Sequence, residues 1–227
     1  KGGEGGGGGR GAGRSGMPPA TATVSGQQQG ETPGGVPIGR AVQMLDSYIV
    51  QETGEGLRIM DQHALHERLL YNQMKRRLDE GRLDSQQLLM PELVELPRQE
   101  FYLVMDLQED LERFGVSVDS FGDSTVIVRS YPQILERFNA EDFIREVIEE
   151  FEDADPTSGA EQCIERLLKV MACKGAVKAD QRLSSEQMRE LLERRAAEDD
   201  EVDTCPHGRP TTVLLSHREL EKQFKRR

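Results

Sequence analysis

Short apolar stretches separated by turn residues predict three strands followed by a helix. The predicted strands cover residues 38–44, 47–51 and 57–60, and Asp46-Ser47 and Thr53-Gly54-Glu55-Gly56 supply the turns between them. In residues 63–78 the leucines 65, 69 and 70 recur at helical spacing, and a glycine at 81 follows. This part of the chain therefore predicts a small antiparallel sheet that leads directly into a helix.

The remaining pattern mixes helices and strands. An extended segment is predicted at 88–96, interrupted by Pro91, and a hairpin is predicted from 116–118 and 125–129. Helices are predicted at 99–114, 140–152 and 161–178, and a further helix is predicted to begin after a cap-like Ser184. A strand at 211–215 and a helix at 216–224 are predicted at the end of the chain. Because strands and helices do not alternate regularly, the predicted class is α+β.

The first 35 residues have a different composition. They contain 14 of the 23 glycines, together with scattered Pro, Gln, Ser and Thr. Such a segment cannot bury enough apolar surface to offset its ordering entropy, so it is predicted to be a disordered linker. Because the chain opens with Lys rather than Met, we expect it to be the C-terminal part of a longer protein, the alternative being an artificial leader.

Composition and charge exclude several classes of protein. No apolar run approaches the roughly 20 residues of a membrane span. Three cysteines are too few for a disulfide framework and indicate reduced thiols in the cytosol. The net charge of −12 argues against a general DNA-coating protein, although residues 205–227 carry six Lys or Arg against two Glu.

The first candidate site is Asp61-Gln62-His63-Ala64-Leu65-His66-Glu67, at the junction of a predicted strand and helix. His63 and Glu67 are four residues apart and share a helix face, which gives half of a site for a borderline metal. Asp61 lies at the strand end, where its side chain can enter a cleft. The alternative is that Asp61 caps the helix and that His63 and Glu67 form a pair facing solvent.

Two further segments carry thiols. Cys205-Pro206-His207-Gly208-Arg209-Pro210 places a Cys and a His two residues apart in a loop stiffened by two prolines, beside an Arg suited to phosphate; a plain turn with a buried Cys is the alternative. Cys173 has small helical neighbours in Ala172–Lys178 and is either a ligand or a buried thiol. The five candidate ligands form a mixed N/S/O set that is typical of zinc: His63, Glu67, Cys173, Cys205 and His207.

These three motifs, in this order, resemble the C-terminal domain of the MutL family of DNA mismatch repair proteins, in its endonuclease-bearing branch. The resemblance covers roughly residues 36–227 and includes a terminal Phe224-Lys225-Arg226. The family's first motif has a second Glu five residues after the first, and this chain has Asn72 there. The resemblance implies a catalytic role for Asp61 and Glu67, and phosphate contacts by Arg209 and Arg226.

The resemblance also implies an organisation. A dimerisation and endonuclease subdomain would comprise residues 36–85 and 161–227, with an external regulatory subdomain inserted at 86–160. The linker at 1–35 would lead to an ATPase domain outside this chain, so that ATP would act only through that domain. The domain would form a homodimer in bacteria, with a cytoplasmic, nucleoid-associated location, or a heterodimer in a eukaryotic nucleus.

A further implied feature is a clamp-binding peptide at Gln86-Gln87-Leu88-Leu89-Met90-Pro91. Gln86, Leu88, Leu89 and Pro91 would dock on the replicative sliding clamp as a polar anchor and apolar plugs. The alternative is an ordinary connecting strand.

The resulting hypothesis is an endonuclease that nicks duplex DNA, with structural or regulatory Zn²⁺ and catalytic Mn²⁺ or Mg²⁺. Sliding clamp and the mismatch-recognition protein MutS are the expected protein partners, and no membrane is expected. The alternative from another class is a non-catalytic dimerisation and docking module with a structural zinc. A zinc metalloprotease is excluded because the chain lacks a His-Glu-x-x-His helix.

Overall fold

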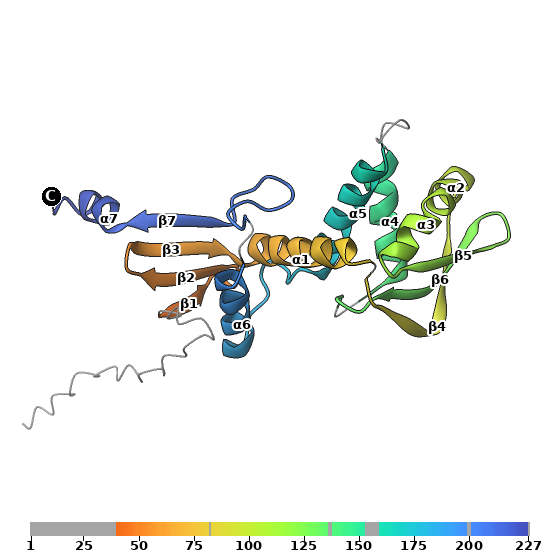
Figure 1. Cartoon of the computed structure of the whole chain (residues 1–227). Helices are drawn as coiled ribbons and strands as arrows, with labels where there is room; N and C mark the ends of the chain where they lie inside the picture. Colours follow the sequence, from red (N-terminus) through yellow and green to blue (C-terminus); the bar gives the residue numbers. More distant parts are fainter. Residues whose placement is uncertain (1–39, 82, 136–137, 153–158, 199–200, 227) are drawn as a thin grey trace, which may run out of the picture.

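The structure, a computed structural model, describes residues 40–81, 83–135, 138–152, 159–198 and 201–226. The predicted linker at residues 1–35 lies outside the described residues. Two antiparallel sheets with helices around them make up the described part of the chain (Figure 1). This arrangement confirms the α+β class that the sequence predicts.

The first sheet has the order β1-β2-β3-β7 and is antiparallel throughout. Its strands are β1 (Ala41–Met44), β2 (Tyr48–Thr53), β3 (Gly56–Asp61) and β7 (Thr212–Ser216). The first three strands follow one another through the predicted tight turns. The fourth comes from near the end of the chain, so the sheet joins segments about 150 residues apart in sequence.

Helix α1 (Gln62–Asp79) starts immediately where β3 ends and runs toward the second sheet (Figure 1). Helix α6 (Ser185–Ala196) covers the same face of the first sheet. The small core between them contains six buried apolar residues: Ile49, Met60, Leu65, Leu69, Leu191 and Leu192. Because α1 is fixed to this sheet at its first turns, the side chains of that part of the helix have defined positions.

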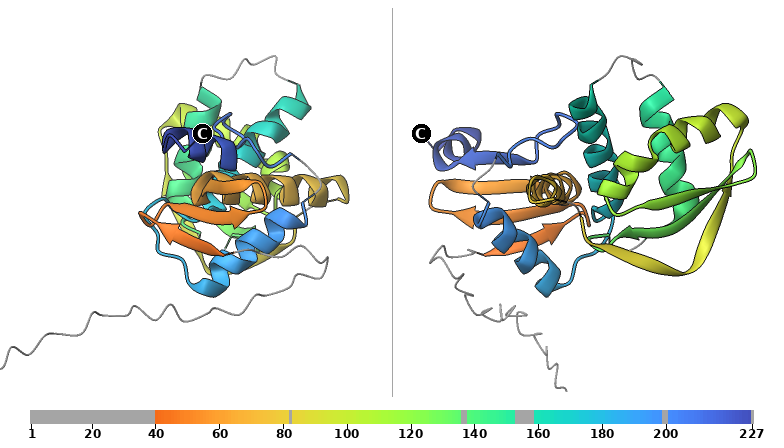
Figure 2. Two further views of the ribbon diagram at one scale, coloured as in Figure 1. Left: turned by 90° about the vertical axis from the view of Figure 1, so that its left-hand side faces the viewer. Right: turned by 45° about the vertical axis from the view of Figure 1, so that its right-hand side comes forward.

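The second sheet has the order β4-β6-β5, from β4 (Ser85–Glu95), β6 (Thr125–Pro132) and β5 (Ser117–Phe121). Helices α4 (Ala140–Glu152) and α5 (Ala160–Gly175) lie next to each other (Figure 2) and share a large core with this sheet and the later part of α1. Helix α7 (His217–Gln223) follows β7 near the end of the chain.

One predicted helix was wrong. Residues 99–114 form two helices, α2 (Arg98–Asp106) and α3 (Gln108–Arg113), separated at Leu107. The N–H of Leu107 is shared between the carbonyls of Leu103 and Val104, and this tightening ends the first helix. Val104, Leu107 and Leu111 are nevertheless all buried, so the core-facing side of the predicted helix continues across this break.

Helix α5 also ends earlier than predicted, at Gly175 instead of residue 178. A Cβ at Gly175 would lie 2.8 Å from a methyl group of Leu135 and 3.0 Å from one of Leu70, so the helix end packs tightly on its neighbours. The chain then becomes extended at Ala176 and passes the first turn of α1. Within the described ranges, no helix combines the length and apolar character needed to cross a membrane.

Candidate metal centre

Residues 203–211 form a tight hairpin that presents Cys205 and His207. The N–H of Cys205 donates to the carbonyl of Arg209 at 2.8 Å, and the N–H of Gly208 donates to the carbonyl of Cys205 at 2.9 Å. Proline favours the position after Cys205 in such a turn, and Gly208 has a φ of +80°, which glycine adopts without steric cost. The unusual Cys-Pro-His-Gly run therefore specifies a rigid two-ligand turn.

Glu67 faces this hairpin from the second turn of α1 and is completely buried. Its Oε1 lies 2.7 Å from Nδ1 of His207. One ligand atom each from Glu67, Cys205 and His207 can lie within 4.8 Å of one another, and they form the one such group found in the part of the chain that the structure describes. Cys205 is buried, whereas the His207 side chain is 38% exposed.

The environment of Glu67 fits a metal ion. Among the described residues, neither carboxylate oxygen has a partner with hydrogen-bond geometry, although the contact with His207 is short. A buried carboxylate without hydrogen bonds is costly unless a cation compensates it. Carboxylate, thiolate and imidazole are the donor types that zinc prefers, and their convergence on one point is the expected arrangement of ligands.

His63 lies one turn before Glu67 and has its orientation fixed by the backbone. Its Nδ1 is 2.9 Å from the carbonyl oxygen of Val177, a contact that requires a proton on Nδ1. The other ring nitrogen, Nε2, then keeps its lone pair for a metal. Donation of one ring N–H to a backbone carbonyl is the usual arrangement in metal-binding histidines. His63 is not part of the three-residue group, and its place in the ligand set stays a prediction.

His66 also contacts Val177, through the backbone N–H of that residue. Its Nδ1 accepts a hydrogen bond of 3.0 Å from the N–H of Val177, so two histidines of α1 hold both polar groups of Val177. Burial, followed by the charges of Arg194 and His63, lowers the pKa of His66 to about 4. His66 is therefore neutral at physiological pH and fixes the segment after α5 against α1.

Cys173 lies near this group without belonging to it. Burial, followed by the carboxylates of Glu146 and then Glu67, raises the pKa of Cys173 to about 11. The thiol is therefore protonated as the structure stands, and a bound cation would favour the thiolate. Its neighbour Lys174 forms a 2.5 Å ion pair with Glu146.

Asp61 caps the helix that follows it, as the alternative interpretation of the first motif predicts. Its Oδ1 accepts a hydrogen bond of 3.0 Å from the N–H of Ala64 and caps α1.

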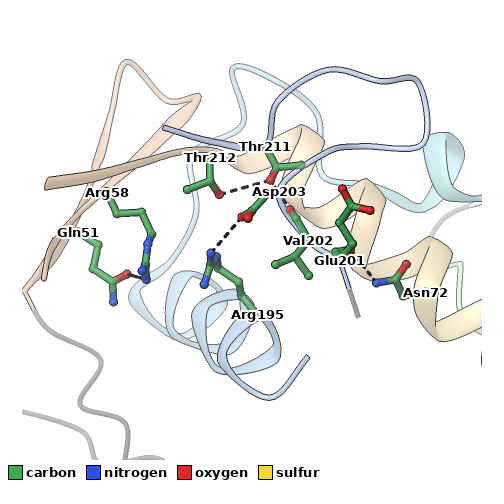
Figure 3. Close-up of polar contacts among 9 residues, drawn as sticks. All are labelled: Gln51, Arg58, Asn72, Arg195, Glu201, Val202, Asp203, Thr211 and Thr212. Carbon is green, nitrogen blue, oxygen red and sulfur yellow. Dashed lines mark hydrogen bonds and ion pairs between the residues drawn. The ribbon is translucent and has the colours of Figure 1, made fainter. Parts of the chain in front are cut away.

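Asn72 is buried and donates from Nδ2 to the carbonyl of Glu201 at 3.3 Å, on the approach to the hairpin (Figure 3). A glutamate at position 72 could not donate this hydrogen bond, so Asn72 has its own structural use.

The two predicted phosphate-binding arginines are far apart. Arg209 is exposed on the hairpin, whereas Arg226 follows α7 at the opposite end of β7 (Figure 1). The guanidinium of Arg226 lies over the ring of Phe224 at 5.8 Å from its centroid. Within one chain, the structure therefore does not bring Arg226 to the metal centre.

Three of the predicted clamp-binding residues, Leu88, Leu89 and Pro91, lie on an irregular part of β4, whereas Gln86 is paired with Tyr131. The pairing of β4 with β6 shifts between Gln87 and Glu92, so the residues between them leave the regular ladder. Leu89 is fully exposed and Met90 is 80% exposed, beside a groove of about 410 Å³ that includes Tyr131.

Two residues important for this geometry escaped the sequence analysis. Gln62 is fully buried and hydrogen-bonds through its side chain to Gln43 and to three backbone carbonyls, those of Asp46, Lys178 and Gln181. Arg68 donates from Nε to the carbonyl of Thr204, at the base of the hairpin. No pattern in the sequence indicates these partners, because all except the Gln43 side chain are backbone groups, and three of them belong to residues more than 100 positions away.

The fold and the buried donor group define an α+β domain with a candidate zinc-type centre. Comparison with known families is consistent with this description: the sequence model of the MutL C terminal dimerisation domain matches residues 41–183. The chain belongs to this family.

Named relatives support the assignment. The chain is 39% identical to the DNA mismatch repair protein MutL of Paramagnetospirillum magneticum over 93% of its length, and 37% identical to that of Rhizobium rhizogenes over 87%. It is 35% identical to the MutL of Mesorhizobium japonicum over 92%. The matched regions cover 33–35% of these relatives, so the chain spans about a third of their length.

Proposed function

We propose that this domain is a metal-dependent endonuclease that nicks one strand of duplex DNA during mismatch repair. The observation that supports the proposal best is the buried Glu67 carboxylate, which lacks hydrogen bonds and faces Cys205 and His207. A zinc ion held by this carboxylate, the thiol and the imidazole would also suit a docking module, so the test of catalysis falls on Asp61, which is outside this group.

The side chains have distinct roles in this proposal. Glu67, Cys205 and His207 hold zinc, and His63 and Cys173 complete the set or hold a second ion. Bound metal, with Mn²⁺ or Mg²⁺ as the catalytic ion, supplies charge neutralisation at the phosphate and an acidified water. Asp61 would ligate the catalytic ion or accept a proton from the attacking water, and Arg209 would contact the phosphate from the exposed rim of the hairpin.

The proposal extends to a homodimer formed through the open face of the first sheet. Val42, Val50, Ile59 and Val213 are paired in register across all four strands. The helices α1 and α6 cover the opposite face, and Val42 and Val213 are more than half exposed. Apolar faces of this kind mark protein interfaces, and the family is described as a dimerisation domain.

The sliding clamp is the second proposed partner. The irregular part of β4 offers exposed Leu89 three residues after Gln86, so that an apolar plug leaves the ladder close to a polar anchor that is still paired with Tyr131. Because the chain carries a net charge of −12, its own affinity for DNA is expected to be weak. Tethering by the clamp, and by the ATPase domain and MutS in the full protein, would raise the effective concentration of DNA at the site.

The test is a nicking assay on supercoiled plasmid with Mn²⁺, with the clamp added or omitted. The variant Asp61→Asn removes the charge of Asp61 but keeps its value as a helix cap, because Asn and Asp cap equally well. We expect the wild type to nick and Asp61→Asn to lose at least 100-fold of the rate, with unchanged zinc content and thermal stability. Leu89→Asp should lose only the clamp-dependent part.

The opposite outcome would favour the docking module. If a folded, zinc-loaded wild type gives no nicks with the clamp present, catalysis by this domain alone is wrong. The full-length protein would then show whether the ATPase domain is required or whether Asn72 has removed activity.

A further inference from the structure

Two arginines converge on the face of the first sheet that helix α6 covers, outside the metal centre. Arg58 comes from β3 and Arg195 from the last turn of α6, and Figure 3 shows their guanidinium groups turned toward each other between the strand and the helix. Burial, followed by the charge of Arg58, lowers the pKa of Arg195. The two cations are thus close enough to repel each other.

The described residues do not neutralise this pair. The side chain of Arg58 donates only to the amide oxygen of Gln51, at 3.4 Å. Arg195 pairs with Asp203 at 3.5 Å, but the Asp203 side chain is 72% exposed. The Nε of Arg195 is buried and has no hydrogen-bond partner among the described residues. Two positive charges therefore face one weakly held carboxylate and leave one donor unused.

The pair also lies at the base of the metal-binding hairpin. The N–H of Thr211 donates to the carbonyl of Asp203 at 3.0 Å and closes the hairpin there, whereas Cys205 and His207 lie at its turn. Both arginine side chains keep some exposure to solvent, so a small anion can reach them. Guanidinium groups match phosphate oxygens well because each presents paired N–H donors in one plane.

We propose that Arg58 and Arg195 form a phosphate-binding site, and that its ligand is a phosphate of the DNA backbone. The identity of the ligand rests on the proposed function, whereas the binding of phosphate itself does not. A phosphate between the two guanidinium groups replaces their repulsion with two charge-assisted contacts and supplies an acceptor for Nε of Arg195. Such a contact would fix the DNA at the base of the hairpin without reading its sequence.

The first test measures thermal stability in inorganic phosphate against chloride at equal ionic strength, in EDTA. The variants are Arg58→Gln and Arg195→Gln. The matched control is Arg189→Gln, because Arg189 lies on α6 as well but is 57% exposed and 4.0 Å from Glu193. We expect phosphate to raise the melting temperature of the wild type and the control by more than that of either variant. General salting effects of phosphate are common to all four proteins and cancel.

The melting temperatures in chloride show whether the substitutions themselves change the stability of the fold. Removing one of two repelling charges should leave the melting temperature unchanged or higher. If Arg195→Gln lowers it in chloride while Arg58→Gln keeps the full phosphate effect, Arg195 is only an anchor for Asp203 and the proposal is overturned. Equal phosphate effects in all four proteins overturn it as well.

The second test distinguishes DNA from free phosphate. Binding of a fluorescent duplex oligonucleotide is measured over a range of salt concentrations in EDTA, where no nicking occurs. If the site takes a DNA phosphate, each variant should bind about tenfold more weakly and lose about 1 from the slope of log K against log salt, and the control should not. A phosphate effect without a change in DNA binding supports the site and assigns it to the free anion.

These tests do not depend on nuclease activity. A wild type that nicks plasmid, with variants that bind phosphate and DNA normally, would contradict the phosphate site and leave the proposed function intact. A wild type that never nicks, with variants that lose the phosphate effect, would support the phosphate site and contradict the proposed function.

Discussion

Glu67 is the residue at which the demands of folding and of function conflict most clearly. Its side chain is fully buried on α1, a position where an apolar residue would stabilise the domain. Its oxygens lack hydrogen bonds within the described residues, and its nearest basic group is His207. Natural proteins accept such a cost at sites where a ligand returns the free energy.

Glu67→Gln should therefore separate the free-energy cost of burying this carboxylate from its contribution to metal binding. In EDTA we expect the variant to be more stable by on the order of 1–3 kcal/mol, because an amide costs less to bury than a carboxyl group that lacks hydrogen bonds. Added zinc should raise the melting temperature of the wild type and much less that of the variant. The control Glu193→Gln, on the exposed side of α6, should behave as wild type. A variant less stable in EDTA with a full zinc response would contradict the assigned role.

His66 gives a prediction about pH. Its pKa of about 4 is below the value of 6.5 for an unfolded histidine, so the unfolded chain takes up a proton first as the pH falls. Above pH 6.5 the His66 side chain is mostly neutral in both the folded and the unfolded chain. Stability attributable to His66 is then lost from pH 6.5 down to about 4, and about 2 kcal/mol of it is lost by pH 5.

Urea unfolding at pH 7 and pH 5, in EDTA to avoid proton competition at the metal ligands, measures this loss. His66→Asn can still accept from the N–H of Val177 but does not titrate in this range. We expect the wild type to lose about 2 kcal/mol more than the variant between the two pH values. Equal losses in the two proteins would show that His66 is not buried in the neutral form.

At the scale of elements, the site depends on the pairing of β3 with β7. Strand β3 leads into α1 with Glu67, and β7 follows directly after the hairpin with Cys205 and His207. The register of five residue pairs between these strands fixes the two halves of the site relative to each other. The antiparallel ladder thus brings together two candidate ligands, Glu67 and Cys205, that are 138 residues apart in sequence.

Gly56, at the start of β3, permits this pairing. It has a φ of +149°, and a Cβ there would lie 2.1 Å from the carbonyl oxygen of Leu215 on β7. Gly56→Ala should force the strands apart, cost about 1–3 kcal/mol in the free energy of unfolding and weaken zinc binding. Gly54→Ala is the matched control from the same turn, because nothing lies within 4 Å of its Cβ position. Chemical denaturation and zinc titration of both variants test this; equal effects would contradict it.

At the scale of the whole molecule, the open face of the first sheet carries a row of apolar side chains on the side away from α1 and α6. The row of Val42, Val50, Ile59 and Val213 is continuous because the strands pair in register, and Met44 and Tyr48 extend it on the same face. A second copy would bury this row in a two-fold contact, the commonest form of homodimer.

Val213→Asp places a charge in the proposed dimer contact, at the β7 end of the apolar row. We expect it to convert the dimer to a monomer at micromolar concentration, as measured by size-exclusion chromatography with light scattering. Phe121→Asp is the control, because Phe121 is 62% exposed on the second sheet. A Val213→Asp protein that remains dimeric, or a Phe121→Asp protein that becomes monomeric, would place the interface elsewhere.

The sequence by itself determined the class of the fold, most of the elements and the set of candidate metal ligands. Local patterns account for this: alternation and turn residues predict β1 to β3, helical spacing predicts α1, and the Cys-Pro-His-Gly run specifies its own turn. The break at Leu107 was not predicted, because it depends on how two short helices reach a core made by distant residues.

Only the tertiary structure decided which candidate ligands meet. It brought Glu67 to Cys205 and His207, placed Arg226 at the far end of β7 and paired Arg58 with Arg195. It also showed that Gln62 and Asn72 serve backbone groups of distant segments. The physical reason is that strand register and helix packing are set by the burial of apolar faces across the whole chain, whereas a motif records only its near neighbours.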